Sequence, residues 1–201
     1  SIDIDASVVT NGGAVDLNAT TLVDLATGQS ITTTGDAAGE AGGAIDIDVS
    51  GTGTVNLVGS LVTTGNTNAA GTGGAGGVVT IDTNNGTASV TAITTDGGAG
   101  TGGGNNGGDA GDVTITTGTD NIITLNGAIS AAGGTSAAAT AGAGGNVTFA
   151  DPVVLATGIT ITTGTTAGNI AFQSTLDSEA SEDNTLGLTA GTGNITFTGA
   201  V

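Results

Sequence analysis

The sequence predicts an all-β protein, a three-sided parallel β-helix, because one short pattern returns at long intervals. Glycine, a small or polar residue, a branched aliphatic residue, another small or polar residue and a large apolar residue follow one another in seven copies. The branched residues of successive copies are 30, 34, 34, 34, 23 and 25 residues apart. Periods of roughly 20–50 residues are typical of solenoids, in which each repeat buries its apolar face against its neighbours.

Each copy alternates between outward and inward side chains, which is the period of a β-strand. Stacking the copies therefore produces two inward columns of apolar residues. The first is β-branched throughout, which suits a pleated and buried surface. The second holds the only three phenylalanines of the chain, on three successive copies. The first column is Val15, Ile45, Val79, Val113, Val147, Ile170 and Ile195, and the second is Leu17, Ile47, Ile81, Ile115, Phe149, Phe172 and Phe197.

Two further strands are predicted in each repeat. Residues 1–12 align without a gap on residues 54–65, so we expect them to be the last part of a preceding rung. The alignment separates a second strand, such as Val55-Asn56-Leu57, from a third strand that ends in a threonine turn, such as 31–35. Adjacent strands lie about 4.8 Å apart, so seven rungs span roughly 30 Å. We expect residues 1–201 to form one solenoid segment of a longer repeat protein.

Glycine-rich inserts follow the third strand at residues 36–42, 66–76, 98–110 and 134–144. They differ in length while the strand pattern continues, so we expect them to leave from one corner. Their composition favours flexible surface loops. The alternative is that they pack together as extended glycine-rich strands. The sixth rung lacks such an insert and is predicted to bulge at residues 174–184 instead.

The charge balance is strongly acidic. The chain has 18 Asp and Glu and no Lys, Arg or His, so its formal net charge is −18. This charge argues against nucleic acid and against insertion into or binding to an anionic membrane, and it favours divalent cations as partners. The sequence also shows no signal peptide and no transmembrane run.

Eight acidic residues are candidate metal ligands. The alternation places Asp16 over Asp46, and Asp48 over Asp82, on the outer face of the first strand. Like charges repel, no side-chain cation relieves them, and Ca²⁺ prefers several oxygen ligands. The alternative is a solvated acidic face screened by salt. The second candidate group lies in the predicted bulge and consists of Asp177, Glu179, Glu182 and Asp183. No organic cofactor is predicted.

Catalysis is not expected. Paired carboxylates can hydrolyse glycosides, but the chain has no basic residue to hold an acidic sugar and no Trp or Tyr to stack on a sugar ring. The absence of histidine also removes the usual activated nucleophiles. An ice- or carbohydrate-surface-binding module is the alternative function, because threonines recur on the third strand. Val62 and the segment 130–132 interrupt that threonine column.

The segments 145–149, 168–172 and 186–201 resemble the repeats of giant filamentous-haemagglutinin-like surface proteins of bacteria. The resemblance implies a right-handed β-helix shaft, export to the cell surface or the extracellular space, and a role in adhesion or surface structure. Members of that family commonly carry Lys and Arg, which this chain lacks. We therefore expect a structural shaft of a filament, matrix fibre or adhesin stalk. Such shafts would associate end to end or side by side, with calcium as a possible cross-link.

Overall fold

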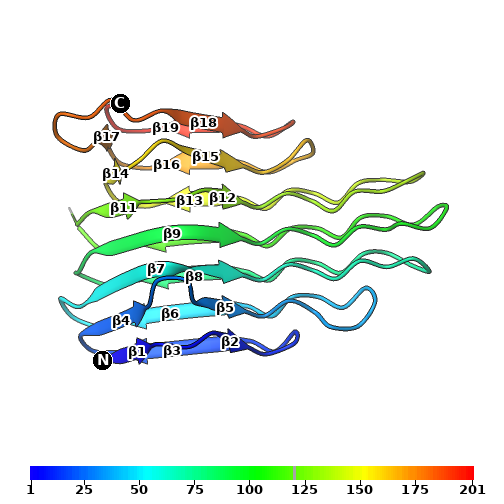
Figure 1. Cartoon of the computed structure of the whole chain (residues 1–201). Coiled ribbons are helices and arrows are strands. Elements are labelled where there is room, and N and C mark those ends of the chain that lie inside the picture. Colours follow the sequence, from blue (N-terminus) through cyan, green and yellow to red (C-terminus); the bar gives the residue numbers. More distant parts are fainter. Residues whose placement is uncertain (120) are drawn as a thin grey trace.

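The computed structural model describes residues 1–119 and 121–201. The described residues contain strands and no helix, and the strands form two sheets in which all neighbouring strands run parallel. Strands that occupy the same place in successive repeats lie one above the other, and the chain climbs from the N-terminus to the C-terminus (Figure 1). The all-β, solenoid-like arrangement that the repeats predict is therefore present.

The first predicted strand of each repeat forms the 7-stranded sheet. Its register follows the predicted columns, with Val15 opposite Ile45 at one end and Phe172 opposite Phe197 at the other. The rings of Phe149 and Phe172 stack with centroids 4.9 Å apart, and those of Phe172 and Phe197 with centroids 5.2 Å apart. The strands are β3 (Val15–Ala19), β6 (Ile45–Val49), β8 (Val79–Asp82), β10 (Val113–Thr116), β13 (Val147–Phe149), β16 (Ile170–Phe172) and β19 (Ile195–Phe197). We define one coil as the chain from the first residue of one of these strands to the residue before the next of them, so that the first coil begins at β3.

The second and third predicted strands lie together in a 12-stranded sheet. Ile2 pairs with Val23, so the first residues lie in the second-strand column, as their alignment on residues 54–65 predicts. The second-strand column is β1 (Ile2–Ile4), β4 (Leu22–Leu25), β7 (Thr54–Val62), β9 (Ala88–Thr94), β11 (Ile123–Leu125), β14 (Val153–Leu155) and β17 (Leu176–Ser178). The third-strand column is β2 (Val8–Val9), β5 (Ser30–Thr32), the ends of β7 and β9, β12 (Ile129–Ser130), β15 (Ile159–Thr162) and β18 (Leu186–Thr189).

Two details differ from the sequence prediction. The second and third strands are continuous in β7 and β9, where the ladder shifts register after Leu57 instead of breaking. Gly59 lies at this bend, and a Cβ there would be 2.8 Å from the Cγ of Leu25 and would overlap the carbonyl oxygen of Gln29. The predicted bulge at 174–184 is also partly strand, because Leu176 continues the second-strand column opposite Val153.

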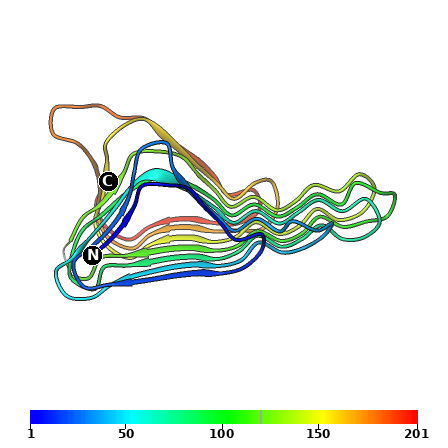
Figure 2. The same ribbon diagram turned by 60° about the horizontal axis from the view of Figure 1, so that its bottom comes forward.

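The core is a single apolar column enclosed by the two sheets. The inward residues of the inner coils, such as Ile47, Ile81, Ile115 and Phe149, are fully buried. In a view tilted toward the stack axis, the coils follow one common outline with a flattened extension at one corner (Figure 2). Each coil therefore buries its apolar side chains against the coils above and below, as expected for a stacked repeat.

The flattened extension contains the glycine-rich inserts, and it corrects the expectation of flexible loops. We call residues 65–76, 97–110 and 133–144 the arms; their outgoing and returning segments form two layers (Figure 2). Backbone hydrogen bonds run back and forth between the layers: Gly74 N donates to Asn66 O, Gly98 N to Gly74 O, Gly108 N to Gly98 O, Gly134 N to Gly108 O and Gly142 N to Gly134 O, all at 2.8–2.9 Å. The second alternative, packed extended strands, is the observed one.

The arms pack with a period of three residues. In the outgoing segment of one arm, Gly65 N donates to Asp96 O, directly before the neighbouring arm, and Asn66 N donates across to Glu40 O. Thr67, the third residue, lies on the outer face. Three residues per turn and hydrogen bonds only to neighbouring chains are features of a polyproline II helix. Two of the three positions require glycine. A Cβ on Gly65, Gly97 or Gly133 would overlap a backbone carbonyl of the opposite layer, and a Cβ on Gly98, Gly108 or Gly142 would overlap a backbone carbonyl of the preceding arm in the same layer.

Candidate functional site

The first group of candidate metal ligands lies on the outer face of the 7-stranded sheet. Asp16 on β3 is directly opposite Asp46 on β6, and Asp48 on β6 is opposite Asp82 on β8, which confirms the predicted register. Three of these carboxylates are exposed and Asp82 is half-buried. Asn18 Nδ2 donates to Asp16 Oδ1 at 2.5 Å, so one amide partly compensates the negative charge of the pair formed by Asp16 and Asp46. The strand register thus forms two stacked carboxylate pairs that share β6.

The Asp46 carboxyl has the most crowded position in this group. Partial burial raises its pKa above the ordinary value of 3.8, and the negative charges of Asp16, Asp48 and Asp82 raise it further. No Lys, Arg or His exists in the chain to lower the pKa again. The ionised form of Asp46, on the outer face of β6, is therefore disfavoured in the folded chain.

The pairs do not assemble into a larger ligand set. Within residues 1–119 and 121–201, no three Asp, Glu, His or Cys side chains are grouped so that they could hold a metal ion. Calcium takes roughly six to eight oxygen ligands, so a pair of carboxylates would have to be completed by water or by another chain. Calcium binding at these residues stays a prediction.

The second candidate group is spread along β17 and the loop that follows it. Asp177 lies on β17, and its Oδ1 accepts a bond from Ser178 N at 2.8 Å. Glu182 Oε2 accepts from Asn184 Nδ2 at 3.2 Å, and the same amide donates to Leu155 O at 3.0 Å. The loop projects from the body as the orange segment of Figure 2. Glu179 and Asp183 are exposed on it, so these four acids do not converge on one point.

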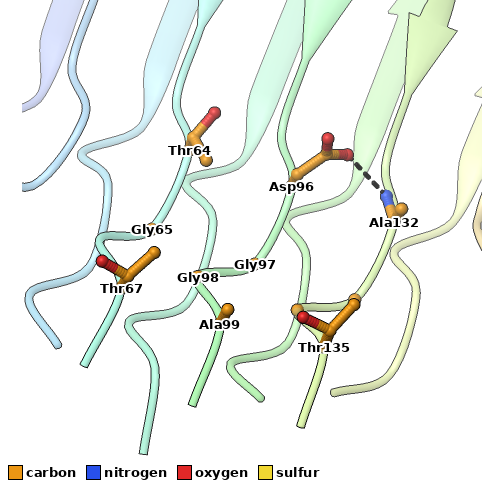
Figure 3. Close-up of a pocket in the computed structure, with 11 residues that line it drawn as sticks. Thr64, Gly65, Thr67, Asp96, Gly97, Gly98, Ala99, Ala132 and Thr135 are labelled. Atoms are coloured by element: carbon orange, nitrogen blue, oxygen red, sulfur yellow. Dashed lines mark hydrogen bonds between the residues drawn. The ribbon is translucent and has the colours of Figure 1, made fainter. Parts of the chain in front are cut away.

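Other acids in the chain have a structural role that the sequence analysis did not identify. Three aspartates of the third coil accept backbone N–H groups of the fourth coil at 2.6–2.7 Å: Asp96 from Ala132, Asp109 from Ala143 and Asp112 from Asn146. The bond between Asp96 and Ala132 is drawn in Figure 3. At these corners the backbone has left the sheet, and a side-chain oxygen replaces the missing carbonyl acceptor.

Asparagine continues the same contact in the later coils. Asn146 Oδ1 accepts from both nitrogens of Asn169, at 3.1 Å from N and 2.9 Å from Nδ2, and Asn169 Oδ1 accepts from Asn194 N at 2.9 Å. Asp112 begins this ladder one coil earlier. A signal was present in the sequence, since an asparagine precedes the branched aliphatic residue in the last three copies of the repeat.

The threonines at the end of the third strand hold the corner at which the chain returns toward the first strand of the next coil. Their side chains are fully buried, and the hydroxyls donate to the glycine carbonyl where the chain returns. The sequence analysis identified the threonine turn but not its inward orientation. In the fourth coil, Ala131 occupies the position of this threonine, so the hydrogen bond from a side-chain hydroxyl is absent there. The pairs are Thr33 to Gly43 at 2.5 Å, Thr63 to Gly77 at 2.6 Å, Thr95 to Gly111 at 2.7 Å and Thr163 to Gly168 at 3.0 Å.

Two shallow grooves are present. One of about 400 Å³ crosses the outgoing segments of the arms, between residues such as Thr67, Asp96 and Thr135 (Figure 3). The Asp96 carboxylate beside it is already engaged by Ser130 and Ala132. The other groove, of about 380 Å³, lies at the last coils and is mainly apolar. Neither groove gathers a nucleophile, a base and an acid among the described residues.

Comparison with known proteins adds no relative: no family model, no curated protein and no solved structure matches this chain. The described residues contain no helix that is long and apolar enough to cross a membrane. The fold and the site geometry alone therefore define the class of protein, an all-β repeat protein with parallel strands in a solenoid-like stack.

Proposed function

We propose that this chain is a segment of a structural shaft, built as a right-handed, three-sided parallel β-helix in an extracellular filament, matrix fibre or adhesin stalk. One observation carries the proposal, the uninterrupted register of the 7-stranded sheet from β3 to β19. Right-handedness is favoured because connections between parallel strands of one sheet are nearly always right-handed.

The mechanical argument follows from the direction of the bonds. In a stack of parallel strands, the hydrogen bonds between neighbouring strands run along the long axis. The apolar columns are buried in every inner coil, so pulling the coils apart would expose them to water. The arms add a second set of hydrogen bonds beside the first, from Glu40 in the first coil to Gly142 in the fourth. A rod with this bonding resists stretching and bending.

The acidic surface supports a role outside a nucleic-acid or membrane context. A net charge of −18 keeps separate rods apart at low ionic strength. Divalent cations would screen or bridge the carboxylate pairs and permit end-to-end or side-by-side association. The resemblance to filamentous-haemagglutinin-like repeats favours a bacterial cell surface as the location. No feature of the described residues favours catalysis.

Electron cryo-microscopy of the purified chain tests the shaft proposal. We expect rods of uniform width, with a layer line near 4.8 Å along the long axis. The comparison is between samples with calcium and samples with a chelator, since longer rods with calcium would support bridging. Globular particles without the 4.8 Å spacing in both samples would contradict a shaft.

The calcium prediction has its own test, independent of the shaft. Asp46→Asn combined with Asp82→Asn removes one carboxylate from each stacked pair. If calcium binds there, added calcium raises the melting temperature of the natural chain but not of the double variant. The matched control is Asp3→Asn with Asp5→Asn, which removes the same charge at exposed positions outside both candidate groups. A calcium effect that persists in the first variant excludes these residues as the site.

One observation favours the alternative of an ice- or carbohydrate-surface-binding module. Thr80, Thr114 and Thr148 are directly opposite one another on the outer face of β8, β10 and β13. The third-strand column is less regular, because Val62 lies opposite Thr32 as the sequence predicts. Thermal hysteresis of a concentrated solution distinguishes the two functions. Thermal hysteresis that Thr114→Leu abolishes would favour ice binding over the shaft. The absence of thermal hysteresis would favour the shaft.

A further inference from the structure

The three strands of each coil differ in the charge of their outward side chains. The outward column of the first strands includes Asp16 and Asp46, and that of the second strands includes Asp24 and Asp177. The outward column of the third strands from β5 to β18 contains no acidic residue. It consists of Thr32, Val62, Thr94, Ser130, Thr162 and Thr189. A chain with a net charge of −18 therefore has a side on which the strands carry no charge.

The outgoing segments of the arms continue this side of the molecule. The third strands run into the arms without turning (Figure 1). The groove of about 400 Å³ on these segments lies between two rows of side chains, and bare glycine backbone such as Gly98 separates the rows (Figure 3). Three residues of a polyproline II strand span about 9 Å, which leaves room for one further row of small side chains. The rows are Thr64, Asp96 and Ala132 on one side and Thr67, Ala99 and Thr135 on the other.

Asp96 is the carboxylate of these two rows, and hydrogen bonds compensate its charge. Its Oδ1 accepts Ser130 Oγ at 2.6 Å and Ala132 N at 2.7 Å. Thr67 and Thr135 are exposed on the outer row. We call the third-strand column and the two rows the neutral face. It is a ridged surface of small side chains that is almost free of net charge.

The neutral face is large enough for a contact between proteins. The third strands and the three outgoing arm segments are each about 4.8 Å wide, and together they cover roughly 700 Å². A stable interface buries about 800 Å² on each partner. The area of the neutral face is therefore close to what a specific complex needs.

We propose that the neutral face is the contact between two copies of this chain, which lie side by side with a row of each copy in the groove of the other. Two identical faces related by a two-fold axis fit each other, because each face offers both rows and a groove. Packed sheets lie about 10 Å apart with interdigitated side chains. The carboxylates on the first and second strands repel a second copy from the other sides. This inference rests on the proposed shaft and identifies its lateral contact.

Sedimentation of the natural chain at neutral pH, with a chelator present, measures this contact. We expect a concentration-dependent dimer that needs no divalent cation. Added NaCl should strengthen the dimer, because salt screens the repulsion between the remaining carboxylates. Thr67→Glu places a carboxylate of each copy in the contact and should raise the dissociation constant about tenfold or more. Because Thr67 is exposed, the melting temperature of the variant should stay close to that of the natural chain.

Ala75→Glu is the matched control, because Ala75 is exposed on the returning segment of the same arm, in the opposite layer. It adds the same charge and should leave the dissociation constant within about twofold. The proposal is wrong if the natural chain stays monomeric at every concentration and salt, if both variants weaken the dimer equally, or if the dimer forms only with calcium. Thermal hysteresis of a monomeric chain that Thr67→Glu abolishes would assign the neutral face to ice instead.

Electron micrographs of the same samples separate this inference from the shaft proposal. Rods with a spacing near 4.8 Å that remain single would overturn the lateral contact and leave the shaft. Particles without that spacing would overturn the shaft. Paired rods in the natural chain and single rods in Thr67→Glu are the result that we expect.

Discussion

At the scale of single residues, buried threonine and glycine determine where each coil opens into an arm. The hydroxyls of Thr63 and Thr95 are fully buried and each reaches the glycine carbonyl at the return of its own arm. A buried carbonyl that loses its donor costs about 1–3 kcal/mol. The arm glycines are needed because they carry no side chain: a Cβ on Gly97 would overlap Gly108 O in the opposite layer, and a Cβ on Gly108 would overlap Gly74 O in the neighbouring arm.

Replacing one of the buried threonine hydroxyls should destabilise the chain measurably. Thr95→Val keeps the shape of the side chain but leaves Gly111 O without its side-chain donor. We expect a loss of about 1–3 kcal/mol in the free energy of unfolding, measured by denaturant titration. Thr95→Ser retains the hydroxyl and should lose clearly less. Equal losses in the two variants would show that the hydroxyl is not what holds the arm base.

Glycine substitutions in the arms should separate into two classes. A Cβ on Gly108 would overlap Gly74 O, whereas a Cβ on Gly103 at the arm tip has nothing within 4 Å. Gly108→Ala should therefore lower the unfolding free energy by about 1–3 kcal/mol or more, and Gly103→Ala should leave it nearly unchanged. Similar melting temperatures for both variants would mean that neighbouring arms are not packed against each other in solution.

At the scale of elements, the corners between strands are held by side chains rather than by sheet bonds. Asp112, Asn146 and Asn169 each accept the backbone N–H of the next coil at the start of its strand. This arrangement explains why acids and amides occur there without any ligand. It also fixes the register, since a shift by one residue would turn every apolar side chain to the outer face.

Interrupting the asparagine ladder should loosen the coils on both sides of the change. Asn169→Ala removes the acceptor of Asn194 N and the donor to Asn146 Oδ1, so we expect a loss of about 1–3 kcal/mol. Gln173→Ala, at an exposed position two residues beyond the centre of the same strand, is the control and should be near neutral. Calorimetry compares the two. Identical transitions would remove the ladder from the account of stability.

At the scale of the whole molecule, the sequence was sufficient for the parts of the fold that depend on a period of two. The columns of Val15 and Leu17 and the opposed pair of Asp16 and Asp46 follow from alternation and an approximately constant repeat. The merging of strands in β7 was not predictable, because it depends on the bend at Gly59. The packed arms were underestimated because a three-residue period of glycine leaves no apolar signal.

The candidate site divides in the same way. Register placed the four acids of β3, β6 and β8 correctly, since it needs only the position of each residue in its strand. The bonds of Asp96, Asp109 and Asp112 to the next coil depend on corner geometry, which no spacing in the sequence reveals. Whether a carboxylate meets a cation or a backbone N–H is decided by that geometry.

The most direct test of the stacked rod is a distance between two spin labels on one outer column. Asp16 and Thr196 belong to the same column, six strand steps apart through Asp46, Thr80, Thr114, Thr148 and Ala171. The chain has no cysteine, so Asp16→Cys and Thr196→Cys provide the only two labelling sites. Pulsed double electron–electron resonance should give a narrow distribution near 29 Å between the labelled backbones, from steps of about 4.8 Å. A broad distribution, or a mean far from that value, would contradict a continuous stack of coils.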